Sequence, residues 1–101
     1  MESTEDTAQA LAALGHPARL SIFRLLVRAG HDGVLVGEIA AHLDIPLSTL
    51  AHHLRTLKQA GLINQTRNGR EVQTIADFAA MQGVLDFLTN ECCAGLKLPA
   101  D

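Results

Sequence analysis

Apolar residues recur along most of this chain at the three- and four-residue spacing of amphipathic helices. The clearest case follows Pro46, where Leu50, Leu54 and Leu57 form one apolar stripe and polar residues occupy the other faces. Similar stripes predict four more helices. The first follows a cap at Ser3 or Thr4 and ends at Gly15-His16-Pro17, and the others lie at residues 17–28, at residues 37–43 and from about Phe78 to Cys93. The pattern therefore predicts a mainly α-helical chain.

Two segments break this helical pattern by alternating between apolar and polar residues. Residues 62–66 and 71–75 flank the turn Arg67-Asn68-Gly69-Arg70, and Asn-Gly between two alternating segments is a strong signal for a β-hairpin. The apolar triplet at residues 34–36 predicts a further short strand. The expected fold class is mainly α with a small β-hairpin, in the order of a winged helix-turn-helix.

Helix boundaries are marked by residues with defined backbone preferences. Pro17 suits the first turn of the second helix, and Gly30 is a plausible stop for it. Ser48 is the expected N-terminal cap of the helix that ends at Gly61. His16 and His42 are interpreted as structural or capping groups.

The 101 residues allow one domain, which we place at residues 1–95 and follow with a frayed tail at residues 96–101. So small a core would gain from a partner subunit. The chain has no apolar run near the roughly 20 residues of a membrane span, and its first residues are acidic. Its two cysteines are adjacent, unlike a secreted disulfide framework. We expect a cytoplasmic homodimer without membrane association.

The distribution of charge matters more than its total. The formal net charge is −3, which argues against a generic nucleic-acid binder. Residues 45–70, however, contain four basic side chains and no acidic one, so positive charge is concentrated on the predicted helix-turn-helix and hairpin. The acidic remainder should limit non-specific binding to DNA.

The order of helix, tight turn, helix and basic hairpin suits the major groove of duplex DNA, which admits one α-helix presented by its N-terminal half. The hairpin would reach the neighbouring backbone or minor groove. We predict that double-stranded DNA is contacted by Ser48, Thr49, His52, His53, Arg55, Arg67 and Arg70.

Three stretches resemble the ArsR/SmtB family of bacterial metalloregulatory repressors. They are Leu14-Gly15-His16-Pro17-Ala18-Arg19-Leu20, the segment from Leu47 to Ile63, and the hairpin turn at residues 67–70. The resemblance implies a homodimer joined through the first and last helices, a palindromic operator and derepression by an inducer. Half-sites would lie about one helical turn, ~34–36 Å, apart.

The inducer sites common in that family are not evident here. Residues 34–39 contain no cysteine, and the last helix has acidic residues but no histidine, which does not favour a zinc site. Attention therefore falls on Cys92 and Cys93. Adjacent cysteines do not easily form a relaxed disulfide, but both can bind one soft atom. Arsenic-responsive members of the family include forms with such a pair after the last helix.

Ligand counting refines this hypothesis. Trivalent inorganic arsenic prefers three thiolates and each chain supplies two, whereas methylarsenite needs only two. We therefore interpret Cys92 and Cys93 as the binding site of a trivalent arsenical inducer, arsenite or methylarsenite, with no obligatory cofactor. Binding would strain the end of the last helix and change the angle of the dimer.

Other interpretations remain open at this point. The pair could respond to antimony(III), cadmium, reactive sulfur or oxidants, or could be two small buried hydrophobes in a dimer interface. A thiol enzyme is disfavoured, since no Gly-rich phosphate loop accompanies the cysteines and so small a core scarcely supplies a pocket. A winged helix that binds protein is disfavoured by the polar outer face of the helix after Pro46.

Overall fold

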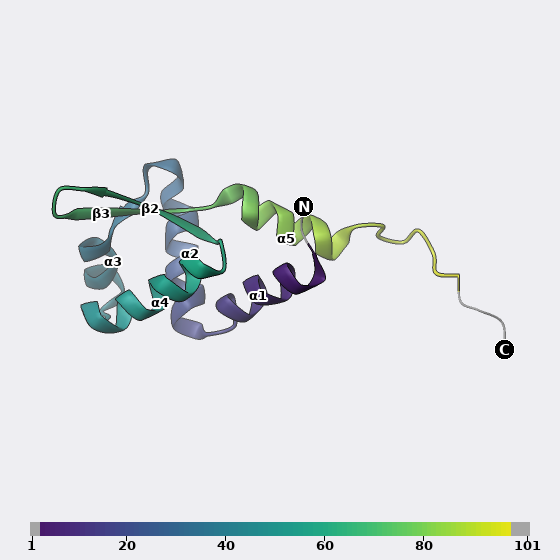
Figure 1. Ribbon diagram of the computed structural model, residues 1–101, viewed down its shortest axis with the longest axis horizontal. Coiled ribbons are helices and arrows are strands. Elements are labelled where there is room, and N and C mark those ends of the chain that lie inside the picture. Colours follow the sequence, from purple (N-terminus) through teal and green to yellow (C-terminus); the bar gives the residue numbers. More distant parts are fainter. Residues whose placement is uncertain (1–2, 98–101) are drawn as a thin grey trace.

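Five helices and a three-stranded sheet make up the computed structural model, which describes residues 3–97 (Figure 1). The helices are α1 (Thr4–Leu14), α2 (Pro17–Ala29), α3 (Val36–Leu43), α4 (Leu47–Gln59) and α5 (Phe78–Thr89), with a 3-10 turn η1 (Gly30–Asp32) after α2. The strands are β1 (Val34–Leu35), β2 (Ile63–Asn68) and β3 (Glu71–Ala76). The predicted winged helix-turn-helix is confirmed.

The sheet is antiparallel in the order β1-β3-β2. Val34 pairs with Thr74 and Leu35 with Gln73, so two of the three residues of the predicted minor strand form it, while Val36 begins α3. Strand β2 pairs with β3 from Ile63↔Ala76 to Asn68↔Glu71. The hairpin turn therefore has Gly69 and Arg70 at its centre, one residue later than an Asn-Gly turn would have. Gly69 has φ +66°, which suits the first central position of a tight hairpin turn.

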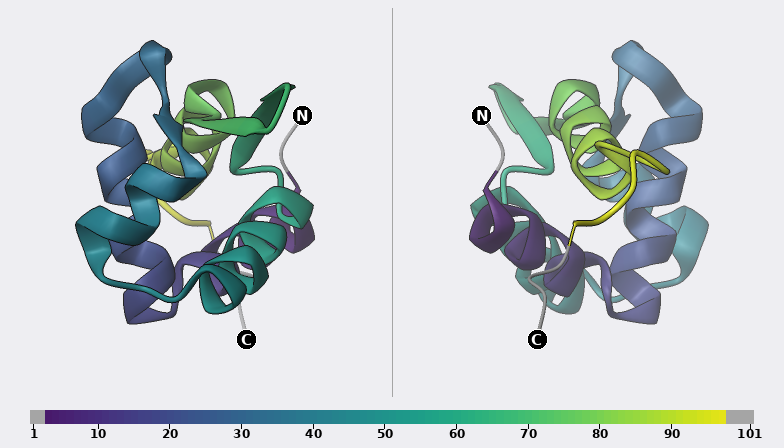
Figure 2. Two further views of the ribbon diagram at one scale, coloured as in Figure 1. Left: turned by 90° about the vertical axis from the view of Figure 1, so that its left-hand side faces the viewer. Right: turned by 90° about the vertical axis from the view of Figure 1, so that its right-hand side faces the viewer.

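The core lies where α1, α2 and α4 pack side by side (Figure 2). The predicted stripe on α4 faces inward, since Leu50, Leu54 and Leu57 are all buried. From the other helices, Ile22, Leu26 and Ile39 are fully buried. Burying each such side chain contributes roughly 1.5–3 kcal/mol to folding.

The start of α2 agrees with prediction, and its end lies one residue later than predicted. Helix α3 begins one residue earlier than predicted, at Val36, and α4 differs at both ends, since it stops at Gln59 and not at Gly61. His16 caps α2 by accepting a hydrogen bond from the Ala18 N–H at its Nδ1, and Pro17 occupies the first helical position. Helix α4 begins at Leu47, so Ser48 lies inside the helix and is not its cap. The Pro46 carbonyl accepts the hydrogen bond of the Leu50 N–H, and this starts the helix without a side-chain cap.

Helix α5 ends at Thr89, four residues before the predicted end. The Thr89 hydroxyl donates to the Leu85 carbonyl, and Asn90 has a non-helical ψ of 135°. Cys92 and Cys93 therefore lie in the turns after the helix. Residues 96 and 97 have no regular structure, and the rest of the predicted frayed tail lies outside the described residues.

The molecule is elongated, with principal extents of 62 × 23 × 19 Å and a radius of gyration of 16.4 Å. A compact domain of this length would have a radius of about 13 Å. Helix α5 and the segment after it extend away from the sheet (Figure 1). No single described helix has the length and apolar character to cross a membrane. Helix α1 and the segment Pro17–Asp32, which joins α2 and η1, meet that test only together, and they bend by 99° at their break.

Candidate nucleic-acid interface

Helix α4 presents a polar outer face above its buried leucines. Ser48, Thr49, His52 and Arg55 are all exposed on it. The first backbone N–H groups of the helix have no helical partner, and the helix dipole places partial positive charge at this end. The face therefore combines hydrogen-bonding side chains with an anion-attracting terminus, which suits the edge of a DNA groove.

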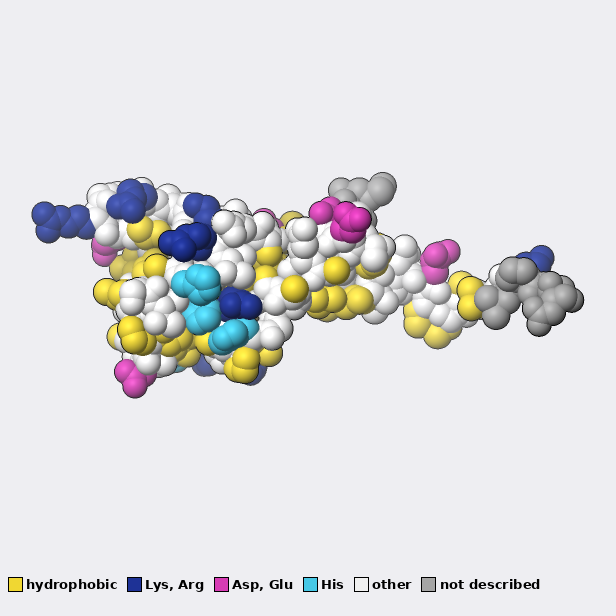
Figure 3. Space-filling model, turned by 60° about the horizontal axis from the view of Figure 1, so that its bottom comes forward, with side chains coloured by type: hydrophobic (Ala, Val, Ile, Leu, Met, Phe, Trp, Pro, Cys, Tyr) yellow, Lys and Arg dark blue, Asp and Glu magenta, His cyan; other side chains and the backbone are white. Residues whose placement is uncertain are grey.

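The wing adds two exposed cations to this face. Arg67 and Arg70 lie at the end of the hairpin, away from the core. Figure 3 shows basic side chains spread along one face of the molecule, from the tip of the wing to a group of histidines. Of the predicted DNA-contacting residues, six are thus exposed: Ser48, Thr49, His52, Arg55, Arg67 and Arg70.

His53 differs from these six, because it is only 7% exposed and does not face outward as predicted. Its Nδ1 lies 3.5 Å from Nη1 of Arg19, and its ring centroid lies 4.9 Å from that of His16. Burial is the main cause that lowers the pKa of His53, and nearby His16, Arg19 and His52 lower it further. The sequence pattern did not link Arg19 to His53.

The side chain of Arg19 is half-buried, and its Nε donates to the Ala13 carbonyl at 2.6 Å. Arg19 therefore ties the start of α2 to the end of α1 and reaches α4 at the same time. The spacing of His16 and Arg19, three residues apart at a helix start, could have indicated that the two share one side of α2.

The lowered pKa of His53 predicts a pH effect on stability. Unfolded His53 has a pKa of about 6.5, so below that pH the unfolded chain binds more protons than the folded one and stability falls as pH falls. In His53→Gln the amide oxygen can still accept from Arg19 but does not titrate. We expect thermal melts between pH 7.5 and 5.5 to show a smaller loss of Tm in His53→Gln than in the wild type. Equal losses would contradict the lowered pKa.

The cysteine pair lies at the other end of the molecule. Both thiols are exposed and their sulfurs are 3.0 Å apart. The hydrogen bond with Cys93, and to a lesser degree burial, raises the pKa of Cys92. Glu91 and Cys93 both have positive φ, +60° and +64°, which costs a non-glycine residue roughly 1–2 kcal/mol. Such strained positions cluster at functional sites.

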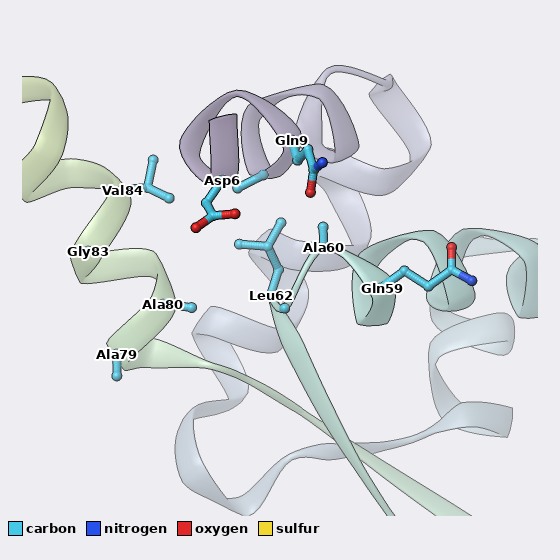
Figure 4. Close-up of a pocket in the computed structure, with 11 residues that line it drawn as sticks. Asp6, Gln9, Gln59, Ala60, Leu62, Ala79, Ala80, Gly83 and Val84 are labelled. Carbon is cyan, nitrogen blue, oxygen red and sulfur yellow. The ribbon is translucent and has the colours of Figure 1, made fainter. Parts of the chain in front are cut away.

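A groove of about 660 Å³ lies between α1, α5 and the turn after α4. Figure 4 shows Asp6 of α1 and Val84 of α5 at its borders, with Leu62 between them. Asp6 is the one titratable side chain among the described residues that line it. Acid–base or nucleophilic catalysis needs at least a second reactive group within reach, so this groove offers no catalytic set.

Comparison with known proteins places residues 14–66 in a helix-turn-helix domain family. The chain is 38% identical to the uncharacterized HTH-type transcriptional regulator MJ1325 of Methanocaldococcus jannaschii, over 68% of this chain and 75% of that protein. It is 32% identical to the transcriptional repressor SdpR of Bacillus subtilis, over 77% of this chain and 83% of that protein.

Solved structures with the same fold include regulators of the ArsR type. An ArsR-like transcriptional regulator from Rhodococcus sp. RHA1 matches with a TM-score of 0.73 and 26% identity, over 83% of this chain and 76% of the other. A possible transcriptional regulator for arsenical resistance matches with a TM-score of 0.65 and 27% identity, over 80% of this chain and 84% of the other. The homodimeric winged helix-turn-helix domain Mb0332 of Mycobacterium bovis matches with a TM-score of 0.67 and 23% identity, over 98% of each chain.

The fold and the basic face together define a winged helix-turn-helix protein that binds DNA. The chain belongs to the helix-turn-helix transcriptional regulators, and it shares its fold with regulators of the ArsR type. Proteins of this class act by binding DNA and are not enzymes.

Proposed function

We propose that this protein is a cytoplasmic, dimeric repressor that leaves a palindromic operator when a trivalent arsenical binds Cys92 and Cys93. The observation that carries the proposal is the exposed thiol pair, with sulfurs 3.0 Å apart in a strained turn. Bonds from thiolates to a metal are about 2.3 Å long, so one atom can bridge two sulfurs that are less than about 4 Å apart. The pair suits a single thiophilic atom without a large rearrangement.

The proposed dimer uses the apolar surface of α1 and α5. Leu11, Leu85 and Leu88 are 41%, 49% and 58% exposed. Figure 3 shows hydrophobic side chains exposed over this half of the molecule. A second copy related by a two-fold axis would cover the same patch on both subunits. The homodimeric state of the Mycobacterium bovis domain, which has the same fold, supports this arrangement.

The proposed DNA contacts divide into two kinds. Ser48 and Thr49 would read base edges in the major groove, whereas His52, Arg55 and the wing arginines would contact phosphates. His53 is buried and would act through its neighbours. Two α4 helices in a two-fold dimer require a palindromic operator, since the symmetry of the protein repeats in the site.

The inducer is proposed to act on the dimer through α5. Asp77 connects this helix to the wing: its carboxylate caps α5 at the Ala80 N–H, its N–H donates to the Leu62 carbonyl, and Asn64 donates to its other oxygen. A change at the end of α5 can therefore alter both the dimer angle and the start of the hairpin. A coupling of about 1–3 kcal/mol would weaken DNA binding by about 5- to 150-fold.

Arsenicals are favoured over other inducers by the number and type of ligands. Among residues 3–97 no group of three histidine, cysteine or acidic side chains is placed to hold a metal ion. Two thiols satisfy methylarsenite, while arsenite would need a third ligand from a small thiol, water or the partner subunit. The similarity to a possible regulator of arsenical resistance also supports this class. Both cysteines are exposed in the single chain, and the DNA-release assay described next separates an inducer site from two small hydrophobes in a dimer interface.

A DNA-release assay tests the proposal. The wild-type protein, bound to a fluorescent duplex selected from a random pool, is titrated with methylarsenite, arsenite, antimonite, cadmium, zinc and peroxide. We expect release at stoichiometric methylarsenite, release by arsenite that an added small thiol strengthens, and none by zinc. Release by cadmium or peroxide alone would favour another thiol sensor, and retention with every compound would exclude a thiol switch.

A further inference from the structure

A compact group of basic side chains lies beside α4 and is contributed by two separate parts of the chain. His16 precedes α2, Arg19 lies in its first turn, and His52 and His53 are on α4. The ring centroids of His52 and His53 are 5.8 Å apart, and His53 lies against both His16 and Arg19. We call these four residues the His/Arg cluster. Figure 3 shows histidine side chains gathered beside Lys and Arg side chains on one face of the molecule.

The hydrogen bonds that the His/Arg cluster already makes determine which of its nitrogen atoms can still bind a ligand. Nδ1 of His16 accepts from the Ala18 N–H, so the neutral ring carries its proton on Nε2. Arg19 can only donate, so Nδ1 of His53 acts as an acceptor toward it and this ring too is protonated on Nε2. Arg19 uses Nε on the Ala13 carbonyl and keeps further N–H groups. The cluster therefore offers hydrogen-bond donors.

No anion within the described chain balances these donors. The shallow groove beside Arg19, of about 350 Å³, is lined by Gln9, Ala12, Ala13, Thr56, Gln59 and Ala60 as well as Arg19. None of these residues is acidic. The positive surroundings are also one of the causes that keep His53 neutral. A metal ion is disfavoured, because the guanidinium of Arg19 lies against His53 and would repel a cation.

We propose that the His/Arg cluster binds one backbone phosphate of duplex DNA, beside the major-groove contacts of α4. His16, Arg19 and His52 contact the phosphate, and buried His53 positions Arg19. Phosphates line both edges of the groove that α4 enters, and contacts to them fix the register of a protein on the duplex. The inference rests on the DNA-binding function and adds α2 to the surface that carries it out.

Three variants test the phosphate site. Arg19→Gln removes the charge, and His16→Ser removes the imidazole but keeps a good helix cap for the Ala18 N–H. Arg24→Gln, on the same helix, is the matched control because Arg24 lies in a different groove, beside His42. Each protein is titrated with the selected duplex and with a scrambled duplex, by fluorescence anisotropy, between about 50 and 200 mM salt.

Loss of a phosphate contact has a defined signature. We expect Arg19→Gln to bind both duplexes about tenfold or more weakly. The plot of log K against log salt should become less steep, its negative slope shrinking in magnitude by about 0.9. His16→Ser should bind both about two- to tenfold more weakly. Arg24→Gln should match the wild type. The equal loss on both duplexes follows because a phosphate carries no sequence information.

The results that would contradict the phosphate site differ from the result that would contradict the DNA-binding function on which it rests. If Arg19→Gln loses discrimination between the duplexes while its salt slope stays unchanged, Arg19 only supports the fold of α4 and the phosphate site is wrong. Wild-type affinity and slope in both cluster variants would overturn it as well. A wild-type protein that binds neither duplex would overturn the DNA-binding function itself.

Discussion

Serine in place of both Cys92 and Cys93 leaves the DNA affinity within about twofold of the wild type and abolishes release by arsenicals. Both thiols are exposed, at the far end of α5 from the wing, so neither supports the core or the DNA-binding face. A serine hydroxyl keeps the size of the side chain but is a poor ligand for a soft atom. The wild type, by contrast, should lose about 5- to 150-fold in affinity when an arsenical binds.

The measurement is anisotropy of a labelled duplex with and without methylarsenite, together with intact mass to count bound arsenic. Glu91→Gln is the matched control, because it changes the same strained turn without removing a thiol. Methylarsenite should still release the Glu91→Gln variant from the duplex. If the double serine variant loses DNA binding, the cysteines have a structural role, and if it is released like the wild type, the inducer binds elsewhere.

A second large effect is expected at the proposed dimer surface. Leu85→Glu combined with Leu88→Glu places two charges on the exposed face of α5, and a two-fold interface would repeat them on the partner. Each leucine buried in a dimer contributes roughly 1.5–3 kcal/mol, so the variant should be monomeric. Its DNA affinity should fall by about 10²–10⁴, since the second half-site is no longer tethered.

Sedimentation velocity and anisotropy on the same samples test this prediction. Leu20→Glu is the control, because Leu20 is 45% exposed but lies on α2. It should remain dimeric. The proposed α5 interface would be contradicted if the free wild-type protein sediments as a monomer. It would also be contradicted if the charged α5 variant stays dimeric.

Much of the fold could be predicted because its determinants are local. The stripe of Leu50, Leu54 and Leu57 repeats with the helical period, and Pro17 and Gly30 have backbone preferences that act wherever they occur. The hairpin likewise follows from Gly69 at a position that needs positive φ. Its register was shifted by one residue because pairing of Asn68 with Glu71 extends the ladder into the predicted turn.

The candidate site was predicted less completely, because burial depends on distant parts of the chain. His53 was assigned to the outer face of α4, but Arg19 and His16, more than thirty residues earlier, cover it. Helical period alone does not reveal such a neighbour. The end of α5 was missed for a different reason: apolar residues continue past it, and only Thr89 and Asn90 marked the stop.

The elongated shape bears on how fast the protein can respond. The cysteine turn and the wing lie toward opposite ends of the long axis, so a duplex on α4 and the wing leaves the thiols open to solvent. An inducer can then bind while the protein is still on its operator. Induction need not wait for spontaneous dissociation, and the observed off-rate should rise with inducer concentration toward the off-rate of the loaded complex. If the inducer bound only protein that had already left the DNA, the off-rate of the complex would not depend on inducer concentration.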